Sequence, residues 1–149
     1  MPAARDERLY FHLQVAAARL RTEADRHCID QAGITTAQAA ALAVIHERPG
    51  ISQRALARTL RQAEPSITTL VRRLIAAGLV DRTVDPGDGR ARALVLTESG
   101  AAALGSVDTA FSVINEHIDA QLTGDEVRQV GDALRRLTAT GTGGSVGLA

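Results

Sequence analysis

The spacing of apolar residues changes along the chain, and this change constrains the fold more than any other feature. Before residue 80 and after residue 97, apolar residues recur every three or four positions, as they do in amphipathic helices. Between these points, the two runs 80–84 and 90–96 alternate, and the turn-forming segment Asp-Pro-Gly-Asp-Gly at 85–89 separates them. This pattern predicts a two-stranded hairpin. We therefore expect a mainly α fold with a small β-hairpin.

Six amphipathic helices are expected around this hairpin. The first runs from about residue 6 to residue 29 without proline or glycine, and Gly78 is placed to end the fourth in a left-handed conformation. Capping signals mark the other starts, namely the capping box Thr35–Gln38 for the second helix, Ser52 for the third, Pro65 in the first turn of the fourth, Thr97 for the fifth and the capping box Thr123–Glu126 for the sixth.

The composition predicts a cytoplasmic protein. The chain has 149 residues, of which 45% are hydrophobic and 23% charged, and these values argue against a disordered or membrane protein. No apolar run approaches the roughly 18–20 residues of a membrane span, and the first residues lack the apolar stretch of a secretory signal. Cys28 is the single cysteine, so it forms no internal disulfide, which fits a reducing compartment.

Charge is distributed unevenly, although the formal net charge is zero. Between residues 51 and 97 there are eight arginines and four acidic residues, a formal charge of +4, and the rest of the chain carries −4. All 17 basic residues are arginine, which we interpret mainly as a codon bias. A basic segment between acidic flanks is expected where one module contacts phosphate and another contacts protein.

This basic segment has the pattern of a winged helix-turn-helix, three short helices followed by a hairpin. An α-helix fits the major groove of DNA, and a projecting ribbon reaches the adjacent minor groove. The fourth helix, expected from about Gln62 to Ala77, is predicted to be the recognition helix. Alone, its polar side chains are equally compatible with a solvated face, but an arginine-bearing ribbon favours DNA. The candidate contacts are Gln62, Ser66, Thr68, Thr69, Arg72 and Arg73 on the helix, with Arg82, Arg90 and Arg92 on the hairpin.

Three motifs, in this order along the chain, resemble those of the MarR family of regulators. They are Ile34-Thr35-x-x-Gln38, Leu74-x-x-x-Gly78-Leu79-Val80, and the segment Asp85 to Gly100, whose Asp88-Gly-Arg90 and Leu96-Thr97-Glu-Ser-Gly100 are similar to the family's Asp-x-Arg and Leu-Thr-x-x-Gly. The resemblance covers about residues 9–137. It implies that Arg90 enters the minor groove and that Asp88 helps to hold it. Gly89 departs from the pattern, because many relatives carry a second arginine there.

The resemblance also implies an obligate homodimer, and the residues lead to the same expectation. The first, fifth and sixth helices carry long apolar stripes that a lobe as small as residues 34–97 cannot cover. We expect an N-terminal dimerisation helix in residues 1–33, a winged helix-turn-helix DNA-binding lobe in 34–97, C-terminal dimerisation helices in 98–140 and a disordered tail in 141–149. A two-fold dimer would present recognition helices about one DNA turn apart, roughly 34–36 Å, and prefer an inverted repeat.

The predicted function is therefore a DNA-binding transcriptional regulator, specifically a ligand-responsive repressor that binds a pseudo-palindromic operator. Members of the family commonly bind small aromatic or phenolic acids. His12 and Arg19 on the first helix are candidate partners for such an anion, although solvated side chains are the simpler interpretation. The sequence identifies neither the effector nor the operator.

Two alternatives remain open. One is a winged-helix adaptor for other proteins that has lost DNA binding, and the other is a regulator that senses oxidants or a metal through Cys28 and the histidines. Cys28 is expected to be a partly buried small residue, and no histidine has the spacing of a metal site. No phosphate loop, nucleophile elbow or paired-carboxylate pattern is present, so neither an enzyme nor a cofactor is expected.

Overall fold

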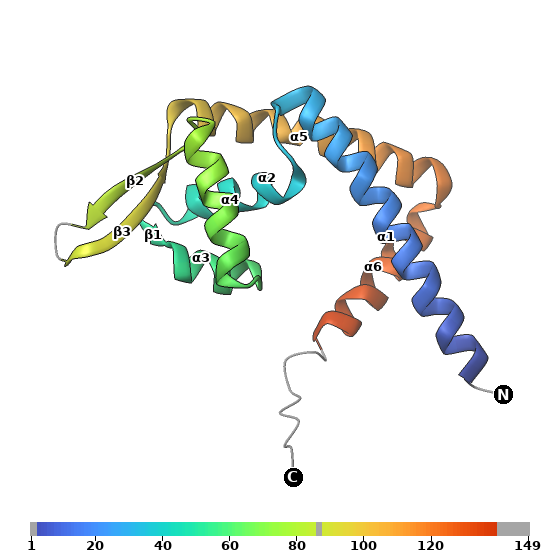
Figure 1. Cartoon of the computed structure of the whole chain (residues 1–149). Coiled ribbons are helices and arrows are strands. Elements are labelled where there is room, and N and C mark those ends of the chain that lie inside the picture. Colours follow the sequence, from blue (N-terminus) through green and yellow to red (C-terminus); the bar gives the residue numbers. More distant parts are fainter. Residues whose placement is uncertain (1–2, 86–87, 140–149) are drawn as a thin grey trace, which may run out of the picture. The chain divides into compact units, whose positions relative to one another are not determined.

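The computed structural model describes the backbone of residues 3–85 and 88–139, and the side chains of residues 8–84 and 93–139. The elements are, in order, α1 (Ala3–Ala32), α2 (Thr36–Glu47), β1 (Ile51–Ser52), α3 (Gln53–Leu60), α4 (Glu64–Ala76), β2 (Val80–Asp85), β3 (Asp88–Leu96), α5 (Glu98–Gln121) and α6 (Gly124–Ala139) (Figure 1). The six helices and the hairpin agree with the prediction. The chain forms two compact units, Met1–Ser112 and Val113–Ala149. The tail for which disorder is predicted lies outside the described residues.

The sheet has a third strand that the sequence did not predict. Its order is β1-β3-β2 with antiparallel neighbours, and Ile51 pairs with Leu94. The Gly50 N–H also donates to the Leu94 carbonyl at 2.9 Å. A strand of two residues is too short to show alternation, which is why the pattern revealed only the hairpin. Ser52 ends this strand and also caps α3, since its Oγ accepts from the Ala55 N–H at 3.1 Å.

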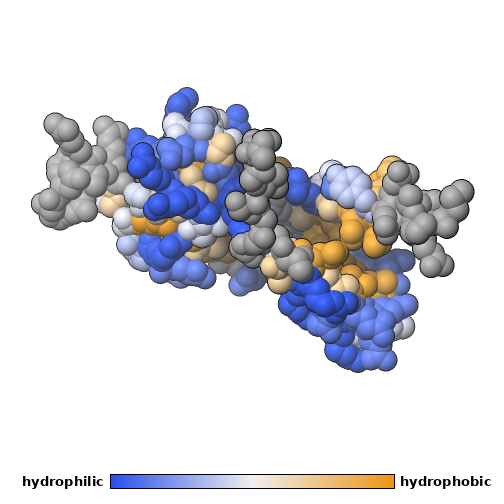
Figure 2. All heavy atoms as spheres, turned by 90° about the horizontal axis from the view of Figure 1, so that it is seen from below, coloured by the Kyte–Doolittle hydropathy of each residue, from blue (hydrophilic) through white to orange (hydrophobic). Residues whose placement is uncertain are grey.

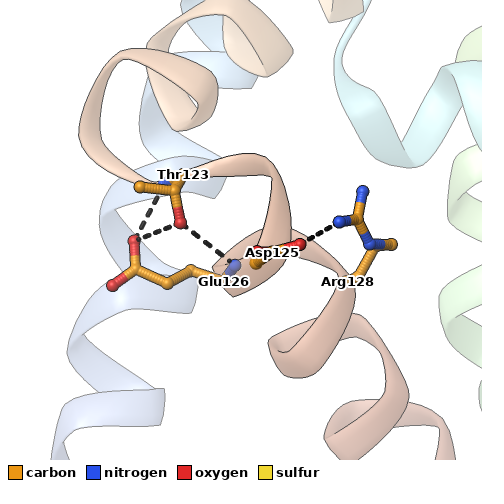
Figure 3. Close-up of polar contacts among 4 residues, drawn as sticks. All are labelled: Thr123, Asp125, Glu126 and Arg128. Carbon is orange, nitrogen blue, oxygen red and sulfur yellow. Dashed lines mark hydrogen bonds and ion pairs between the residues drawn. The ribbon is translucent and has the colours of Figure 1, made fainter.

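The two predicted capping boxes are confirmed. At the start of α2, the Thr35 Oγ1 accepts from the Gln38 N–H at 3.2 Å and the Gln38 Oε1 accepts from the Thr35 N–H at 2.9 Å. At the start of α6, the Thr123 N–H donates to the Glu126 Oε2 at 2.8 Å, and the Glu126 N–H donates to the Thr123 Oγ1 at 3.3 Å (Figure 3). Each box satisfies backbone donors that a helix start leaves unpaired.

One contact that the sequence did not predict joins α1 to α2. The Asp25 Oδ1 of α1 accepts from both the backbone N–H and the hydroxyl of Thr36, at 2.8 and 2.6 Å. A carboxylate at a helix N-terminus also interacts favourably with the helix dipole. The end of α1 is therefore fixed to the start of α2.

The core of the unit Met1–Ser112 lies between α2, α3, α4 and the sheet. Cys28 of α1 and Val107 and Ala110 of α5 join the same cluster. Because one cluster includes residues of α3, α4 and the hairpin, these elements are held in fixed relative positions. Its fully buried side chains from α2 to β3 include Leu42, Ile45, Leu56, Ile67, Val71, Leu74, Val80 and Leu94.

The start of α5 is anchored on the turn that follows α4. The Thr97 hydroxyl donates to the Gly78 carbonyl at 2.6 Å and accepts from the Gly100 N–H at 3.0 Å, as predicted for a cap, and the Thr97 N–H donates to the Leu79 carbonyl at 3.1 Å. A Cβ at Gly100 would lie 2.0 Å from the Leu79 oxygen. Only glycine fits there, which gives the Leu-Thr-x-x-Gly segment a physical basis.

The unit Val113–Ala149 contains the end of α5 and the whole of α6. None of the residues of α6, all of which are described, is buried. Its apolar side chains Val130, Leu134 and Leu137 are exposed, as are other hydrophobic groups that Figure 2 shows in orange at the surface. Ion pairs join Asp125 to Arg128 and Asp132 to Arg135 on the same helix, the first of them drawn in Figure 3. Within the described part of the chain, the apolar face of this amphipathic helix is therefore exposed.

Among the described residues, no single helix is long and apolar enough to cross a membrane. Only α1 and α2 taken together meet the length and composition test, as a pair bent by 65° at the break between them.

Candidate nucleic-acid interface

The predicted recognition helix is α4, and its apolar stripe is turned into the core. Ile67, Val71 and Leu74 are fully buried, which leaves the polar positions between them on the opposite, outer face. The helix begins at Glu64, two residues after the predicted start, because the Gln62 N–H donates back to the Ala57 carbonyl at 3.0 Å and closes α3. Gln62 therefore lies in the turn between the two helices.

The predicted base-reading residues share the outer side of this helix-turn-helix. Thr68 is half-buried, and the other five are exposed, namely Gln62, Ser66, Thr69, Arg72 and Arg73. Within the described part of the chain, no hydrogen bond or ion pair engages the side chains of Arg72 and Arg73. Each guanidinium therefore offers its N–H donors to solvent or to a ligand such as a phosphate or a guanine edge.

The two threonines of α4 use their hydroxyl protons within the helix. The Thr68 hydroxyl donates to the Glu64 carbonyl at 3.0 Å, and the Thr69 hydroxyl donates to the Pro65 carbonyl at 3.2 Å. A hydroxyl oxygen still has acceptor capacity after its proton is donated. These two residues are therefore arranged to accept hydrogen bonds from outside the helix.

Gln53 connects α4 to the hairpin, and sequence reasoning missed it. Its Nε2 donates to the Thr68 Oγ1 at 2.6 Å, and its Oε1 accepts from a guanidinium nitrogen of Arg82 at 3.1 Å. A single glutamine thus joins α3, α4 and β2 on the outer side of the lobe. Nothing in the local sequence signals this role, because it depends on residues 15 and 29 positions away.

Two further polar contacts lie around the helix-turn-helix. The Arg54 Nε of α3 is 3.4 Å from the Glu64 Oε1 of α4, and both side chains are exposed. Arg48, just after α2, donates to the hydroxyl of Thr59 in α3. An exposed ion pair of this kind is worth only about 0–1 kcal/mol. The core, rather than these contacts, therefore holds the helices together.

The turn between α3 and α4 contains a strained residue. Arg61 has φ 52° and ψ 45°, the only positive φ among the non-glycine residues that the structure describes. This left-handed conformation costs an L-residue with a Cβ about 1–2 kcal/mol. Its N–H donates to the Arg58 carbonyl at 3.2 Å, and its side chain is exposed. An arginine therefore occupies a backbone position that suits glycine, next to the recognition helix.

The hairpin carries the remaining predicted contacts. Arg82 of β2 is exposed. Asp88, Arg90 and Arg92 belong to β3, where the structure describes their backbone but their side chains lie outside its described part. Arg92 pairs with Val84, and the register shifts between Val84 and Asp85. Beyond this shift Asp85 pairs with Asp88, so the pairing of the two strands extends past Arg90, where the resemblance puts the minor-groove arginine.

The redox and ligand candidates lie on α1. Cys28 is fully buried, deeper than the partly buried position predicted. Burial raises the pKa of its thiol, and the Asp25 carboxylate adds to this effect, so the reactive thiolate is disfavoured.

His12 and Arg19 are both exposed, and the His12 ring contacts that of Phe11 edge-on. Among the described residues, no group of three or more His, Cys, Asp or Glu side chains is placed to hold a metal ion.

Comparisons with known proteins agree on one family. A model of the MarR family matches residues 32–91. A Thauera aromatica protein, whose name assigns it to regulation of the hcr operon, is 33% identical over 132 residues, which cover 87% of this chain and 78% of that protein. The transcriptional repressor CouR, solved bound to a 23-mer DNA duplex, is 30% identical with a TM-score of 0.73, covering 89% of this chain and 90% of its own. The PcaV regulator of Streptomyces coelicolor, solved with its natural ligand, is 28% identical with a TM-score of 0.71, covering 88% of this chain and 94% of its own.

Proposed function

Because this chain belongs to the MarR family of winged-helix, DNA-binding transcriptional regulators, we propose that it is a ligand-responsive repressor that binds a pseudo-palindromic operator as a homodimer. One observation carries the proposal. The exposed polar face of α4 and the arginine-bearing hairpin are fixed on a single core. The family membership also favours a DNA-binding regulator over an adaptor. The same proposal puts the protein in the cytoplasm with its operator.

In this proposal, α4 docks in the major groove and the hairpin reaches the neighbouring minor groove. Ser66, Thr69, Arg72 and Arg73 are exposed on α4, and this supports contacts with base edges and phosphates. We assign the minor-groove contact to Arg90, with Asp88 holding it, and further wing contacts to Arg82 and Arg92. Gln62, in the turn, and Thr68, half-buried, complete the proposed interface.

The homodimer is supported by apolar side chains that are exposed in the described part of one chain. On α6, Val130, Leu134 and Leu137 are spaced by four and three residues, so they share one face of the helix. On α1, Tyr10 and Phe11 are 66% and 62% exposed. Burying a side chain of this size stabilises an interface by about 1.5–3 kcal/mol. A second copy supplies matching surfaces, as the two-fold symmetry of most homodimers requires.

Repression and the response to a ligand are proposed by analogy with two structural neighbours. One is named as a transcriptional repressor and was solved on DNA, and the other was solved with its natural ligand. We propose a small aromatic or phenolic acid as the effector, with His12 and Arg19 as candidate contacts. They lie seven residues apart, so they occupy similar faces of α1 about two turns apart. An effector that releases DNA must bind the DNA-incompetent arrangement more tightly than the competent one.

The proposal is tested by recovering the operator. Purified protein is used to capture fragmented genomic DNA, which is sequenced, and the enriched site is titrated at several salt concentrations. We expect a pseudo-palindrome bound by two chains with a steep salt dependence. Weak binding without sequence preference would contradict the proposal and favour the adaptor.

The wing assignment is tested on the same site. Arg90→Ala should weaken binding and reduce the salt slope by about one, since one phosphate or groove contact is lost. Arg135→Ala serves as the control, because it removes an equal charge from α6. Unchanged affinity and slope for Arg90→Ala would remove Arg90 from the interface.

A further inference from the structure

Gln53 is placed between the two DNA-contacting parts of the lobe. It occupies the first position of α3 and is half-buried. Its side-chain amide makes two hydrogen bonds. The oxygen accepts from Arg82 of β2 at 3.1 Å, and the nitrogen donates to the Thr68 hydroxyl oxygen of α4 at 2.6 Å. We refer to the chain of contacts through Arg82, Gln53, Thr68 and the Glu64 carbonyl as the Gln53 relay.

The donors and acceptors of the relay permit only one orientation of the Gln53 amide, and so only one direction for its hydrogen bonds. A guanidinium only donates, so the amide oxygen of Gln53 must face Arg82. The amide nitrogen must then face Thr68, and its N–H makes the Thr68 oxygen an acceptor. The Thr68 proton is consequently directed to the Glu64 carbonyl, 3.0 Å away. Each hydrogen bond thus orients the next, an arrangement in which neighbouring bonds polarise one another.

Arg82 and Thr68, at the two ends of the relay, retain hydrogen-bonding groups that are available to DNA. Arg82 has five N–H donors, of which the contact with Gln53 uses one. The Thr68 oxygen accepts from Gln53 and still has a second lone pair. The contacts therefore restrain these side chains without occupying them. Ordering them before DNA arrives lowers the conformational entropy lost on binding.

We propose that Gln53 is a positioning residue that couples the wing to the recognition helix and thereby contributes to discrimination between the operator and unrelated DNA. The inference rests on the proposed docking of α4 and the hairpin in adjacent grooves. A specific site requires both parts to be in register with their grooves at once, whereas non-specific binding depends mainly on phosphate charge. Gln53 carries no charge, so we expect it to contribute to specific binding and not to non-specific binding.

A purely structural role for Gln53 is separable from this one. The core side chains Ile67, Val71 and Leu74 hold α4 on the lobe, and none of them belongs to the relay. Arg82 is exposed and Thr68 is half-buried, so their hydrogen bonds lie near the surface. Loss of the relay should therefore leave the melting temperature nearly unchanged while it changes DNA binding.

The experiment uses the full chain and Gln53→Met, a substitution of similar size that removes both hydrogen bonds. Two probes are titrated, a duplex that the wild-type protein enriches from a randomised library and a scrambled duplex of the same composition. The cost of ordering Arg82 and Thr68 only when DNA binds predicts that affinity for the enriched duplex falls about fivefold to tenfold. Affinity for the scrambled duplex and the salt slope should stay nearly unchanged, and Gln31→Met on α1 should have no effect.

Double variants test the coupling itself. Gln53→Met is combined with Arg82→Met and, separately, with Thr68→Val, which removes the hydroxyl at constant shape. If the relay operates, each pair weakens binding to the enriched duplex less than the product of its single effects.

Three results overturn the inference. They are additive effects in both double variants, an equal loss of affinity for both duplexes, and binding of Gln53→Met indistinguishable from wild type. If the wild-type protein enriches no duplex at all, the proposed function fails and the relay fails with it.

Discussion

The lobe of residues 34–97 and helix α6 differ in what happens to their apolar residues. In the lobe, Leu42, Leu56 and Leu74 are fully buried within one chain. On α6, Leu134 and Leu137 remain 42% and 58% exposed. The core of the lobe is thus closed within one chain, with Cys28 of α1 and Val107 and Ala110 of α5 contributing to it, whereas the described single chain leaves the apolar face of α6 exposed. The proposed DNA interface is therefore positioned within one chain, whereas the proposed homodimer would use the helices outside the lobe.

Helix α1 contains both kinds of environment. Towards its end, Ala24 and Cys28 are buried, and Asp25 caps α2. Towards its start, Leu9, Tyr10 and Phe11 are exposed. One continuous helix therefore connects the lobe to a proposed dimer surface, and variants at its two ends should behave differently.

The largest effect is expected from Leu134→Glu on α6. In the proposed dimer, two copies each lose the burial of a leucine, about 3 kcal/mol or more in total. This loss corresponds to a dissociation constant more than a hundredfold higher. Sedimentation over a dilution series measures the change.

Arg128→Gln is the matched control for this variant. It changes the net charge by the same amount on the face of α6 that carries the ion pair with Asp125. We expect the control to remain dimeric. A Leu134→Glu protein that remains as dimeric as wild type would show that a different surface joins the copies.

The next effect concerns the junction between the lobe and α5. Gly100→Ala brings a Cβ to 2.0 Å from the Leu79 carbonyl oxygen, and this oxygen belongs to backbone that cannot rotate away. Such overpacking should lower the free energy of unfolding by roughly 2–3 kcal/mol. Gly105→Ala, on the same helix with no atom within 4 Å, should raise it by about 0.5–1 kcal/mol. Urea unfolding at one chain concentration compares the two, and equal effects would refute the proposed close approach.

A smaller effect, a gain in stability in place of the loss expected for Gly100→Ala, is predicted for a substitution at Arg61. Glycine adopts φ 52° without strain, so Arg61→Gly should raise the free energy of unfolding by about 0.5–1 kcal/mol. Arg58→Gly, in the last turn of α3, should lower it by about 0.7 kcal/mol because glycine is a poor helix former. Thermal unfolding of both variants gives the two signs, and a loss of stability for Arg61→Gly would contradict strain at this turn.

The smallest effect is a pH dependence of stability that arises from Cys28 of α1, which lies in the core cluster. Burial and the Asp25 carboxylate raise the pKa of the Cys28 thiol, so the folded chain holds its proton more tightly than the unfolded chain. Stability from this source is complete below the ordinary thiol pKa and is lost as the pH rises beyond about 8.5. Unfolding between pH 7 and pH 10 should therefore show an additional decline in wild type compared with Cys28→Ala. Parallel curves would contradict it.

Local signals predicted most of the fold. The capping box at Thr35, the glycine at residue 78 and the alternation around residues 85–89 are properties of neighbouring residues, and each marks an element that the structure contains. Strand β1 was missed because two residues, Ile51 and Ser52, form a strand only through their partner β3. The sequence predicts a start of α4 that is two residues too early, because the hydrogen bond from the Gln62 N–H to the Ala57 carbonyl depends on the geometry of the turn.

The candidate site was less predictable than the fold. Exposed polar residues of α4, such as Arg72 and Arg73, follow from the helical period once the apolar stripe is known. Gln53 could not be found in this way, since its two partners lie on other elements. Patterns of spacing thus indicate which residues face outward, but not which of them contact one another.

The central claim is that two identical lobes, joined through the helices outside them, read two half-sites of one operator. The most direct measurement inserts five base pairs, half a helical turn, between the half-sites of the enriched duplex. We predict that affinity falls to that of a single half-site, because a rigid dimer cannot reach half-sites on opposite faces of the DNA. Affinity unchanged by the insertion would contradict the claim, because it would mean that the two lobes bind independently of one another.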